Sequence, residues 1–255
     1  MNLGLAGRVA LITGGARGIG LAHARALGHE GAVIILNDVD EQAAEAAVGG
    51  LRADGIQVGF RPGDATVPDV VEDTVAGVLS EHGRLDILVN NAGIGVKPAA
   101  LVQEMPFDAW QRMLHVHLDS TFLWSRAAVA PMRENGFGRI INTSSMNFTG
   151  GGRPGVAHYS AAKAGIVGLT RTMAKEVGPL GITVNAIAPG YVATELIAQF
   201  SADMMRRLQS QNPMGRLCQP EEVAALVAFL CSGHAGFING ELICMDGGRR
   251  DFYWG

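Results

Sequence analysis

A tyrosine and a lysine four residues apart form the pair best suited to proton chemistry in this chain. Tyr159 and Lys163 stand in the stretch YSAAK, on an expected helix beginning near His158, so both side chains lie on one helix face. A free tyrosine titrates at about 10, so acid or base work near neutrality needs about 4 kcal/mol of phenolate stabilisation. The lysine ammonium can supply part of it. A packed tyrosine beside an exposed lysine is the alternative interpretation.

A glycine-rich turn supplies a second chemical element. The stretch TGGARGIG, residues 13–20, follows an apolar run and opens a helix. Backbone amides at such a strand-to-helix turn face the anionic pyrophosphate of a dinucleotide at the positive end of the helix. Any tight turn uses glycine, so the position after the first strand supports this interpretation more than the glycines do. The candidate residues are Gly14, Arg17, Gly18, Ile19 and Gly20.

Asp38 ends the next apolar run, eighteen residues beyond Gly20. A carboxylate there accepts hydrogen bonds from the adenosine ribose hydroxyls and repels a 2′-phosphate, which favours NAD over NADP. Arg17 is the opposing feature, because a guanidinium in the turn can bind a 2′-phosphate, although a solvated surface arginine is the common case. We expect NAD as the cofactor, with NADP as the less favoured alternative.

Two histidines beside an acid form a third candidate site. His115 and His117 stand two residues apart in MLHVHLDSTF, and Asp119 follows them. The apolar spacing of residues 107–135 indicates a helix, on which the two histidines point about 200° apart. Paired histidine ligands on a helix need a spacing of three or four, so we do not expect a metal site.

Seven apolar runs rich in β-branched residues alternate with helix-length segments. The runs cover residues 8–13, 32–38, 56–60, 85–91, 138–145, 182–188 and 241–248. Between some of them, apolar side chains recur at spacings of three and four, as in amphipathic helices, over residues 41–54, 67–83, 107–135 and 220–232. This alternation predicts an α/β doubly wound fold, with one seven-stranded parallel sheet and helices on both faces.

The composition bounds the class of protein. With 255 residues, 48% of them hydrophobic and 17% charged, the chain is long enough for one large domain, and we expect a single domain over its whole length. The net charge is −4, and no basic cluster is larger than Arg206–Arg207 or Arg249–Arg250, so we do not expect binding to nucleic acid or to an anionic membrane.

The first residues lack the basic region of a signal peptide, so we expect a cytoplasmic protein. Without a CxxC pair, the cysteines are expected to be buried free thiols: Cys218, Cys231 and Cys244.

Five motifs, TGGARGIG, NNAG, YSAAK, NAIAPGYVAT and MDGG, occur in this order along the whole chain. Jointly they resemble those of the short-chain dehydrogenase/reductase family, in its compact single-domain branch. The resemblance implies a doubly wound Rossmann fold and hydride transfer to or from a nicotinamide cofactor. It also identifies Ser145 in INTSS as the family's serine, which hydrogen-bonds the substrate oxygen. Tyr159 would exchange the proton, and Lys163 would hold the ribose hydroxyls while lowering the tyrosine pKa.

Three further segments match positions that contact the cofactor in the family. NNAG ends the fourth strand, GDAT follows the third and meets adenine, and PGYVAT follows the sixth and faces the nicotinamide carboxamide. The residues concerned are Asn91, Ala92, Gly93, Asp64, Ala65, Pro189, Gly190, Val192 and Thr194. Turn-forming and capping roles are the alternative interpretation.

His117 departs from the family pattern. The family's active site usually includes an asparagine in the order Val-Asn-Leu, and here the order is Val-His-Leu. In the family this asparagine fixes a helix distortion whose main-chain carbonyl holds a water in contact with the lysine, and a main-chain role can survive substitution. A neutral histidine offers one donor and one acceptor, whereas its titration at about 6.5 would add charge beside Lys163. We expect a packed His117, with direct catalysis as the alternative.

Positions that face the substrate in the family carry a neutral set here, without a convergent arginine pair. The set comprises Gly95, Val96, Met146, Asn147, His158 and Tyr191. This favours a secondary alcohol of the polyol, sugar-like or cyclic kind and its ketone. Arg153, at the expected pocket mouth, leaves a 3-oxoacyl thioester open as the substrate. Residues 195–212 stand where the family has a mobile lid, and amphipathic packing explains their pattern equally well.

The tail RRDFYWG carries three aromatic residues, which are costly to expose, and C-termini in this family often reach a neighbouring subunit. We therefore expect a homotetramer.

Two functions remain open: an NAD-dependent alcohol dehydrogenase or carbonyl reductase, and a catalytically idle dinucleotide-binding regulator or scaffold. The joint presence of Ser145, Tyr159 and Lys163 argues against the idle protein.

Overall fold

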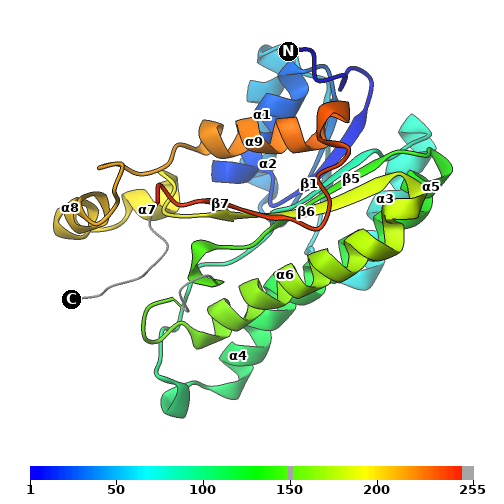
Figure 1. Ribbon diagram of the computed structural model, residues 1–255. Helices are drawn as coiled ribbons and strands as arrows, with labels where there is room; N and C mark the ends of the chain where they lie inside the picture. The colour runs from blue at the N-terminus through cyan, green and yellow to red at the C-terminus, as the bar shows by residue number, and fades with distance from the viewer. Residues whose placement is uncertain (149–151, 249–255) are drawn as a thin grey trace.

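The computed structural model describes residues 1–148 and 152–248, and the aromatic tail expected to reach a neighbouring subunit lies outside them. Within this part of the chain, seven parallel strands form one sheet in the order β3-β2-β1-β4-β5-β6-β7 (Figure 1). The strands are β1 (Val9–Thr13), β2 (Val33–Asp38), β3 (Val58–Pro62), β4 (Ile87–Asn90), β5 (Gly138–Thr143), β6 (Ile182–Pro189) and β7 (Leu242–Met245). Nearly all of their residues fall within the seven predicted runs, and the predicted parallel sheet is confirmed.

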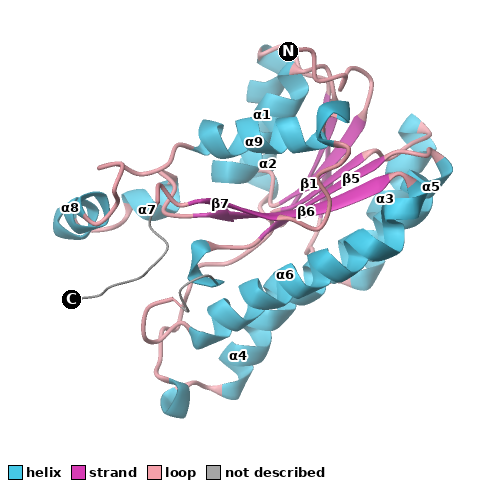
Figure 2. Cartoon of the chain, viewed as in Figure 1, coloured by secondary structure: helices cyan, strands magenta, loops and turns pink. Residues whose placement is uncertain are grey.

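Helices cover both faces of the sheet (Figure 2). One face carries α1 (Gly18–His29), α2 (Glu41–Ala53) and α9 (Pro220–Cys231), and the other carries α3 (Pro68–His82), α5 (Ser120–Glu134) and α6 (Ala157–Val177). The remaining helices are α4 (Phe107–Leu114), which leads into α5, and the short α7 (Glu195–Ala198) and α8 (Ala202–Ser210). The doubly wound arrangement follows from the alternation of strand and helix along the chain.

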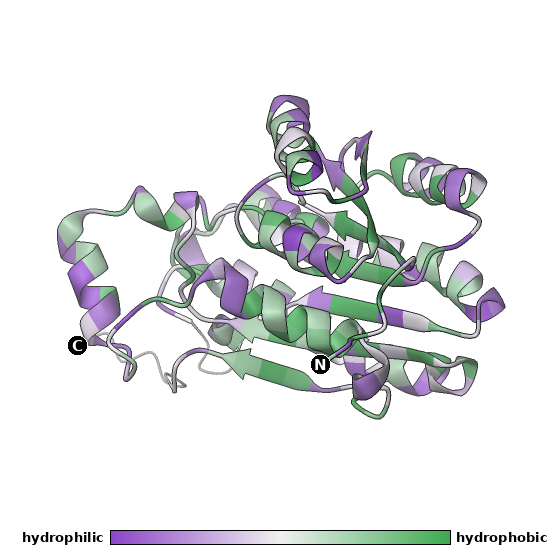
Figure 3. Ribbon diagram, turned by 90° about the horizontal axis from the view of Figure 1, so that it is seen from above, coloured by the Kyte–Doolittle hydropathy of each residue, from purple (hydrophilic) through white to green (hydrophobic). Residues whose placement is uncertain are grey.

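A separate apolar core lies on each face of the sheet. The α1/α2/α9 side packs Leu27, Leu51 and Val223 against the strands, and the other side packs Trp124 and Met132. The strands therefore lie between two apolar layers. In Figure 3 the strands are largely hydrophobic, whereas hydrophobic and hydrophilic residues alternate along the helices. A strand that is buried on both faces has a continuous run of apolar residues, which explains why the strands could be predicted from the sequence.

The strand order reverses between β1 and β4, because β2 follows β1 on one side of it and β4 pairs with its other side. In doubly wound sheets, ligands bind beyond the carboxyl ends of the strands at this switch point. The loops that leave β1, β2 and β4 meet there, and α7 and α8 extend beyond the carboxyl ends of β6 and β7 (Figure 1).

The three cysteines correct one expectation. All three are thiols outside any disulfide, and Cys231 is buried, but Cys218 and Cys244 are only half-buried. Cys218 lies beside the segment that leaves β6, and Cys244 lies in β7 at the sheet edge. No helix within residues 1–148 and 152–248 combines the length and apolar character needed to cross a bilayer.

Candidate active site

The structure brings the three predicted catalytic side chains together. Ser145 follows β5, and Tyr159 and Lys163 occupy successive turns of α6. Ser145 and Tyr159 are hydrogen-bonded to each other, and the Ser145 Oγ accepts a hydrogen bond from the Asn147 backbone N–H at 3.2 Å. This second bond fixes the serine at the start of a short 3-10 turn, Met146–Phe148.

Lys163 is buried beside the tyrosine, with 4% of its surface exposed. Its Nζ lies 5.6 Å from the centroid of the Tyr159 ring and donates a hydrogen bond to the Thr143 carbonyl at 2.6 Å. The Ser144 hydroxyl donates to the Lys163 carbonyl at 2.8 Å, which ties α6 to the end of β5. Burial lowers the pKa of Lys163 to about 7, so its ammonium can release a proton near neutrality.

The tyrosine itself corrects an expectation. Burial raises the pKa of Tyr159, the hydrogen bond from Ser145 works in the opposite direction, and Tyr191 adds to the increase. Among the protein's own groups, burial therefore outweighs the lowering expected from Lys163, because the charged phenolate is poorly solvated there. Additional positive charge in the cleft is needed to offset this effect.

The helical stretch predicted over residues 107–135 is present as α4 and α5, with a π-helical turn between them around the two histidines. Between α4 and α5, residues His115–Asp119 form the wider turn, and the Ser120 backbone N–H donates to the His115 carbonyl five residues earlier. The Ser120 hydroxyl donates to the Val116 carbonyl at 2.6 Å, and the Thr121 hydroxyl to the His117 carbonyl at 2.8 Å. The distortion that the family resemblance attributed to asparagine is thus present with histidine in its place.

The His117 ring packs between the tyrosine and the loop after β4. It is 3% exposed and meets the Tyr159 ring edge-on, with 5.2 Å between centroids. Its Nε2 lies 3.3 Å from the Ile94 nitrogen and 3.2 Å from the Ile94 oxygen, and the tautomer decides which of them it bonds. A Cβ at Gly93 would lie 2.5 Å from the ring. Burial, together with the charge of Lys163, lowers the pKa of His117 to about 2, so the ring is neutral.

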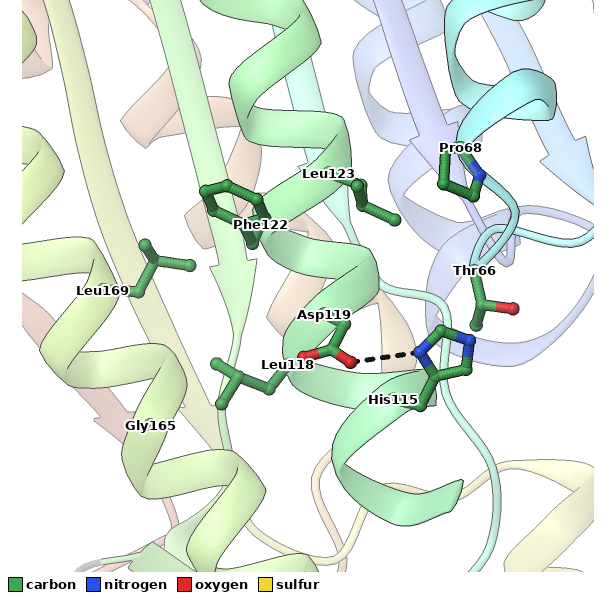
Figure 4. Close-up of a pocket in the computed structure, with 9 residues that line it drawn as sticks. All are labelled: Thr66, Pro68, His115, Leu118, Asp119, Phe122, Leu123, Gly165 and Leu169. Atoms are coloured by element: carbon green, nitrogen blue, oxygen red, sulfur yellow. Dashed lines mark hydrogen bonds and ion pairs between the residues drawn. The ribbon is translucent and has the colours of Figure 1, made fainter. Parts of the chain in front are cut away.

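His115 lies on the opposite, exposed side of the helix. Its Nδ1 pairs with the Asp119 carboxylate at 3.0 Å, at the edge of a groove of about 670 Å³ that also contains Leu118, Phe122 and Leu169 (Figure 4). The two histidines therefore face different surroundings, as the helical spacing predicted. Among the described residues, three or more His, Cys, Asp or Glu side chains nowhere gather as metal ligands.

A cleft of about 660 Å³ lies at the switch point of the sheet. It is lined by the glycine-rich turn, the end of β2, the GDAT and NNAG loops, and the first residues of α7. The predicted residues that line it are Gly14, Arg17, Gly18, Ile19, Asp38, Asp64, Ala65, Asn91, Ala92, Gly93 and Thr194. With Arg112 and Val116, which also line it, segments from six places in the sequence thus form one continuous site.

The glycine-rich turn is pinned to the end of β4. Gly14 has φ +61°, and a Cβ there would lie 2.9 Å from the Ala92 Cα. The Asn91 side-chain amide donates to the Gly14 carbonyl at 2.9 Å, and the Thr13 hydroxyl accepts from the Ala92 backbone N–H at 3.0 Å. Gly20 does not line the cleft, because a Cβ there would lie 2.1 Å from the Gly14 carbonyl oxygen, so its role is close packing within the turn.

The cleft fits a dinucleotide at both ends. α1 begins at Gly18, and Gly18 and Ile19 line the cleft, so the positive N-terminal end of this helix is available to an anionic pyrophosphate. A Cβ at Gly18 would lie 3.4 Å from the Thr194 side chain. At the other end, Asp38 Oδ2 accepts from the Ala16 N–H at 3.0 Å and Oδ1 from the Asp40 N–H at 3.1 Å. Each oxygen keeps a lone pair for a ribose hydroxyl.

The segment after β6 has two functions. Thr194 lines the cleft, whereas Gly190 donates its N–H to the Met245 carbonyl at 2.9 Å and Val192 bridges to Cys218. Pro189, which ends β6, and these two residues do not line the cleft, so their predicted contact with the cofactor is not seen in its lining. Of the predicted substrate residues, Tyr191 acts electrostatically on Tyr159, Met146 is buried next to the serine, Asn147 is half-buried, and Gly95 is exposed in the loop that leaves β4.

Several cleft residues were not identified from the sequence. Thr66, whose hydroxyl donates to Asp64 Oδ1 at 2.8 Å, orders the GDAT loop, and Arg112 lines the cleft from α4. Asp40 pairs with Arg17 at 2.7 Å. Asp40 carried a local signal, since an acid just before a helical pattern is a common N-cap, but its contact with the glycine-rich turn is long-range.

Comparison with known proteins gives consistent matches over nearly the full chain. A family model described as enoyl-(acyl carrier protein) reductase matches residues 14–250. Cis-4-hydroxycyclohexanecarboxylate dehydrogenase of Sinomonas cyclohexanicum is 40% identical over 97% of this chain and 98% of its own. The 3-oxoacyl-(acyl-carrier-protein) reductase of Vibrio cholerae is 38% identical over 96% and 98%. The crystal structure of gox2181 superposes with a TM-score of 0.92 at 35% identity, over 98% of this chain and 99% of the other.

Proposed function

The chain belongs to the short-chain dehydrogenase/reductase family, and from this premise we propose that it interconverts a secondary alcohol and its ketone with NAD(H). As a member it is an oxidoreductase that uses a nicotinamide dinucleotide. The observation that carries the finer proposal is the grouping of Ser145, Tyr159 and Lys163. The three side chains do not line the cleft that fits a dinucleotide, but the His117 ring, which packs on Tyr159, bonds the backbone of Ile94 in the cleft lining. A catalytically idle binding protein has no need of this arrangement.

The three side chains divide the proton chemistry among them. The Ser145 hydroxyl holds the substrate oxygen next to the Tyr159 hydroxyl, to which it is already hydrogen-bonded. In the oxidative direction, the tyrosine oxygen takes the alcohol proton as the C–O bond becomes a carbonyl, and in reduction it returns that proton. When bound, the nicotinamide accepts or donates the hydride at the substrate carbon. Lys163 holds the ribose hydroxyls and favours the phenolate.

His117 has a positioning role in this proposal. Its neutral ring packs on Tyr159 and bonds the Ile94 backbone, so it fixes the tyrosine relative to the loop after β4. With a pKa of about 2, its ring is neutral near pH 7, so no imidazolium is present there to act as an acid. Direct acid catalysis by His117 is therefore not part of the proposal.

NAD is the proposed cofactor because a carboxylate stands where the adenosine ribose binds. Asp38 lines the cleft and would bond the ribose hydroxyls and repel a 2′-phosphate. Arg17, the residue that favoured NADP in the sequence, is paired with Asp40 at 2.7 Å. Homotetrameric assembly and a cytoplasmic location stay predictions from the sequence.

For the substrate, we propose a cyclic or polyol-like secondary alcohol. A relative 40% identical is a cis-4-hydroxycyclohexanecarboxylate dehydrogenase, and the candidate substrate residues Gly95, Met146, Asn147 and Tyr191 are uncharged. The second candidate is a 3-oxoacyl thioester, since 3-oxoacyl-(acyl-carrier-protein) reductases reach 38% identity and Arg153 is exposed near the start of α6.

A substrate panel distinguishes these candidates. The purified protein is assayed for nicotinamide absorbance with cyclic alcohols, polyols and 3-oxoacyl thioesters, each with NAD(H) and NADP(H). We expect turnover of a cyclic alcohol or polyol with NAD, and at least about tenfold lower kcat/KM with NADP. Turnover confined to the thioesters would select the second candidate. Cofactor binding without turnover of any compound would favour the regulator or scaffold.

A further inference from the structure

A carboxylate that the sequence analysis did not identify stands at the β2 end of the cleft. Asp40 caps α2, with its Oδ1 accepting from the Ala43 N–H at 2.9 Å. Its own backbone N–H donates to Asp38 Oδ1 at 3.1 Å, so the two acids are neighbours in one hydrogen-bonded turn. Both line the cleft together with Arg17. Two negative groups and one cation therefore surround the place where the adenosine ribose would bind.

The cation is engaged by Asp40 and not by Asp38. Arg17 Nη2 lies 2.7 Å from Asp40 Oδ2, with the two side chains 59% and 41% exposed. Asp38 accepts backbone N–H groups from Ala16 and Asp40 instead. A guanidinium is the group best suited to bind a phosphate at two points, and in this chain a second acid already holds it. An exposed pair of this kind adds little to stability, so releasing it leaves the fold intact.

We propose that Asp40 determines cofactor specificity by holding Arg17 in an ion pair, which denies a 2′-phosphorylated adenosine the cation that it needs. The inference rests on the proposed function and deepens it, because the preference for NAD is assigned to two carboxylates with different tasks. Asp38 binds the ribose hydroxyls. Asp40 holds the Arg17 guanidinium in an ion pair, and without that pair the guanidinium would bind the 2′-phosphate of NADP.

Ligand binding tests this proposal without any substrate. The full-length protein is titrated calorimetrically, at low salt, with adenosine 5′-monophosphate and with adenosine 2′,5′-bisphosphate. The variants are Asp40→Asn, Arg17→Gln and the double substitution. Asparagine preserves the N-cap of α2. The matched control is Asp54→Asn, which removes an exposed acid at the other end of α2, paired there with Arg25 at 3.0 Å.

We expect Asp40→Asn to tighten binding of the bisphosphate by about fivefold and to change binding of the monophosphate by less than about twofold. The gain should disappear when Arg17→Gln is added, because the released guanidinium causes it. Asp54→Asn should change neither affinity.

Two results would overturn the proposal. If Asp40→Asn does not tighten binding of the bisphosphate, the ion pair with Asp40 does not keep Arg17 from the phosphate. If the gain is equal with and without Arg17→Gln, Asp40 acts only through its own charge. Failure of the unmodified protein to bind either NAD or adenosine 5′-monophosphate is a different result, since it would contradict the proposed function itself.

Discussion

At the scale of single residues, burial decides which groups carry charge in the site. Lys163 is enclosed at the end of β5 with the Thr143 carbonyl as acceptor, and burial brings its pKa down from 10.5 to about 7. Between these two values the unfolded chain holds a proton that the folded chain lacks, so the free energy of unfolding rises with pH across that window. Below pH 7 the full penalty for burying the ammonium remains.

Lys163→Met should therefore change the pH dependence of stability. Without cofactor, we expect the original protein to gain about 1 kcal/mol per pH unit relative to the variant between about pH 7.5 and 9.5. Denaturant unfolding at several pH values measures this difference. Lys175→Met, on the exposed face of the same helix, is the matched control and should give parallel curves. If the stability curve of Lys163→Met also runs parallel to that of the original protein, the pKa of Lys163 is not lowered in the folded state.

His117→Asn should retain activity, because an amide can supply the same donor or acceptor to the Ile94 backbone. We expect kcat/KM to stay within about tenfold. The neutral histidine does not titrate near neutrality, so the acid limb of the pH profile should not move. His115→Asn, on the exposed side of the helix, is the control. A loss beyond tenfold with a shifted acid limb would assign His117 a direct proton role.

The residues that were predictable are those whose partners lie on the same element. Tyr159 and Lys163 share one helix face at a spacing of four, whereas Ser145, whose partner Tyr159 lies on another element, was identified through the family resemblance. The ion pair of Asp40 with Arg17 was not predictable, because it joins the N-cap residues of α1 and α2, which are far apart in the sequence. The raised pKa of Tyr159 depends on how many groups surround it, and no local pattern records that.

At the scale of elements, one buried hydrogen bond connects α5 to the cofactor cleft. Trp124 is 1% exposed, and its indole N–H donates to the Ala65 carbonyl at 3.0 Å. Ala65 belongs to the GDAT loop that lines the cleft next to Asp38. The packing of the α5 face of the sheet thereby sets the position of a loop that adenosine would contact.

Trp124→Phe should lower the free energy of unfolding by about 2 kcal/mol, because the buried carbonyl loses its donor and some packing is lost. Binding of adenosine 5′-monophosphate should weaken at the same time. Denaturant unfolding and calorimetry measure the two effects. Trp110→Phe, at a half-buried position of α4, is the control. Loss of stability with unchanged nucleotide affinity would show that the loop is positioned independently of α5.

Elements were predictable in kind but not in local detail. The two-sided burial of the strands leaves long apolar runs, and the switch from strand to helix periodicity marks each connection. The π turn at His115–Asp119 was not marked by the apolar periodicity, and only the family resemblance pointed to a helix distortion there. Ser120 and Thr121, whose hydroxyls stabilise this turn, cannot be distinguished in the sequence from serine and threonine in a regular helix.

At the scale of the whole molecule, the doubly wound topology brings six separate segments to one cleft. The Ser145, Tyr159 and Lys163 group is connected to that cleft through His117 and Ile94. The order of motifs predicted this convergence, because parallel strands present their carboxyl ends at one edge of a sheet. Substrate identity was not predictable in the same way, since it depends on a few side chains around Tyr159 and not on the fold.

Comparison of Tyr159→Phe with the original protein tests the central claim most directly. On the best alcohol of the panel, with NAD and at the pH optimum, we expect kcat/KM to fall by at least about 100-fold, because the variant lacks the hydroxyl that exchanges the substrate proton. Calorimetry should show unchanged affinity for adenosine 5′-monophosphate, which confirms that the cleft is intact. Equal turnover by the two proteins would contradict the assignment of Tyr159 as the acid and base of this site.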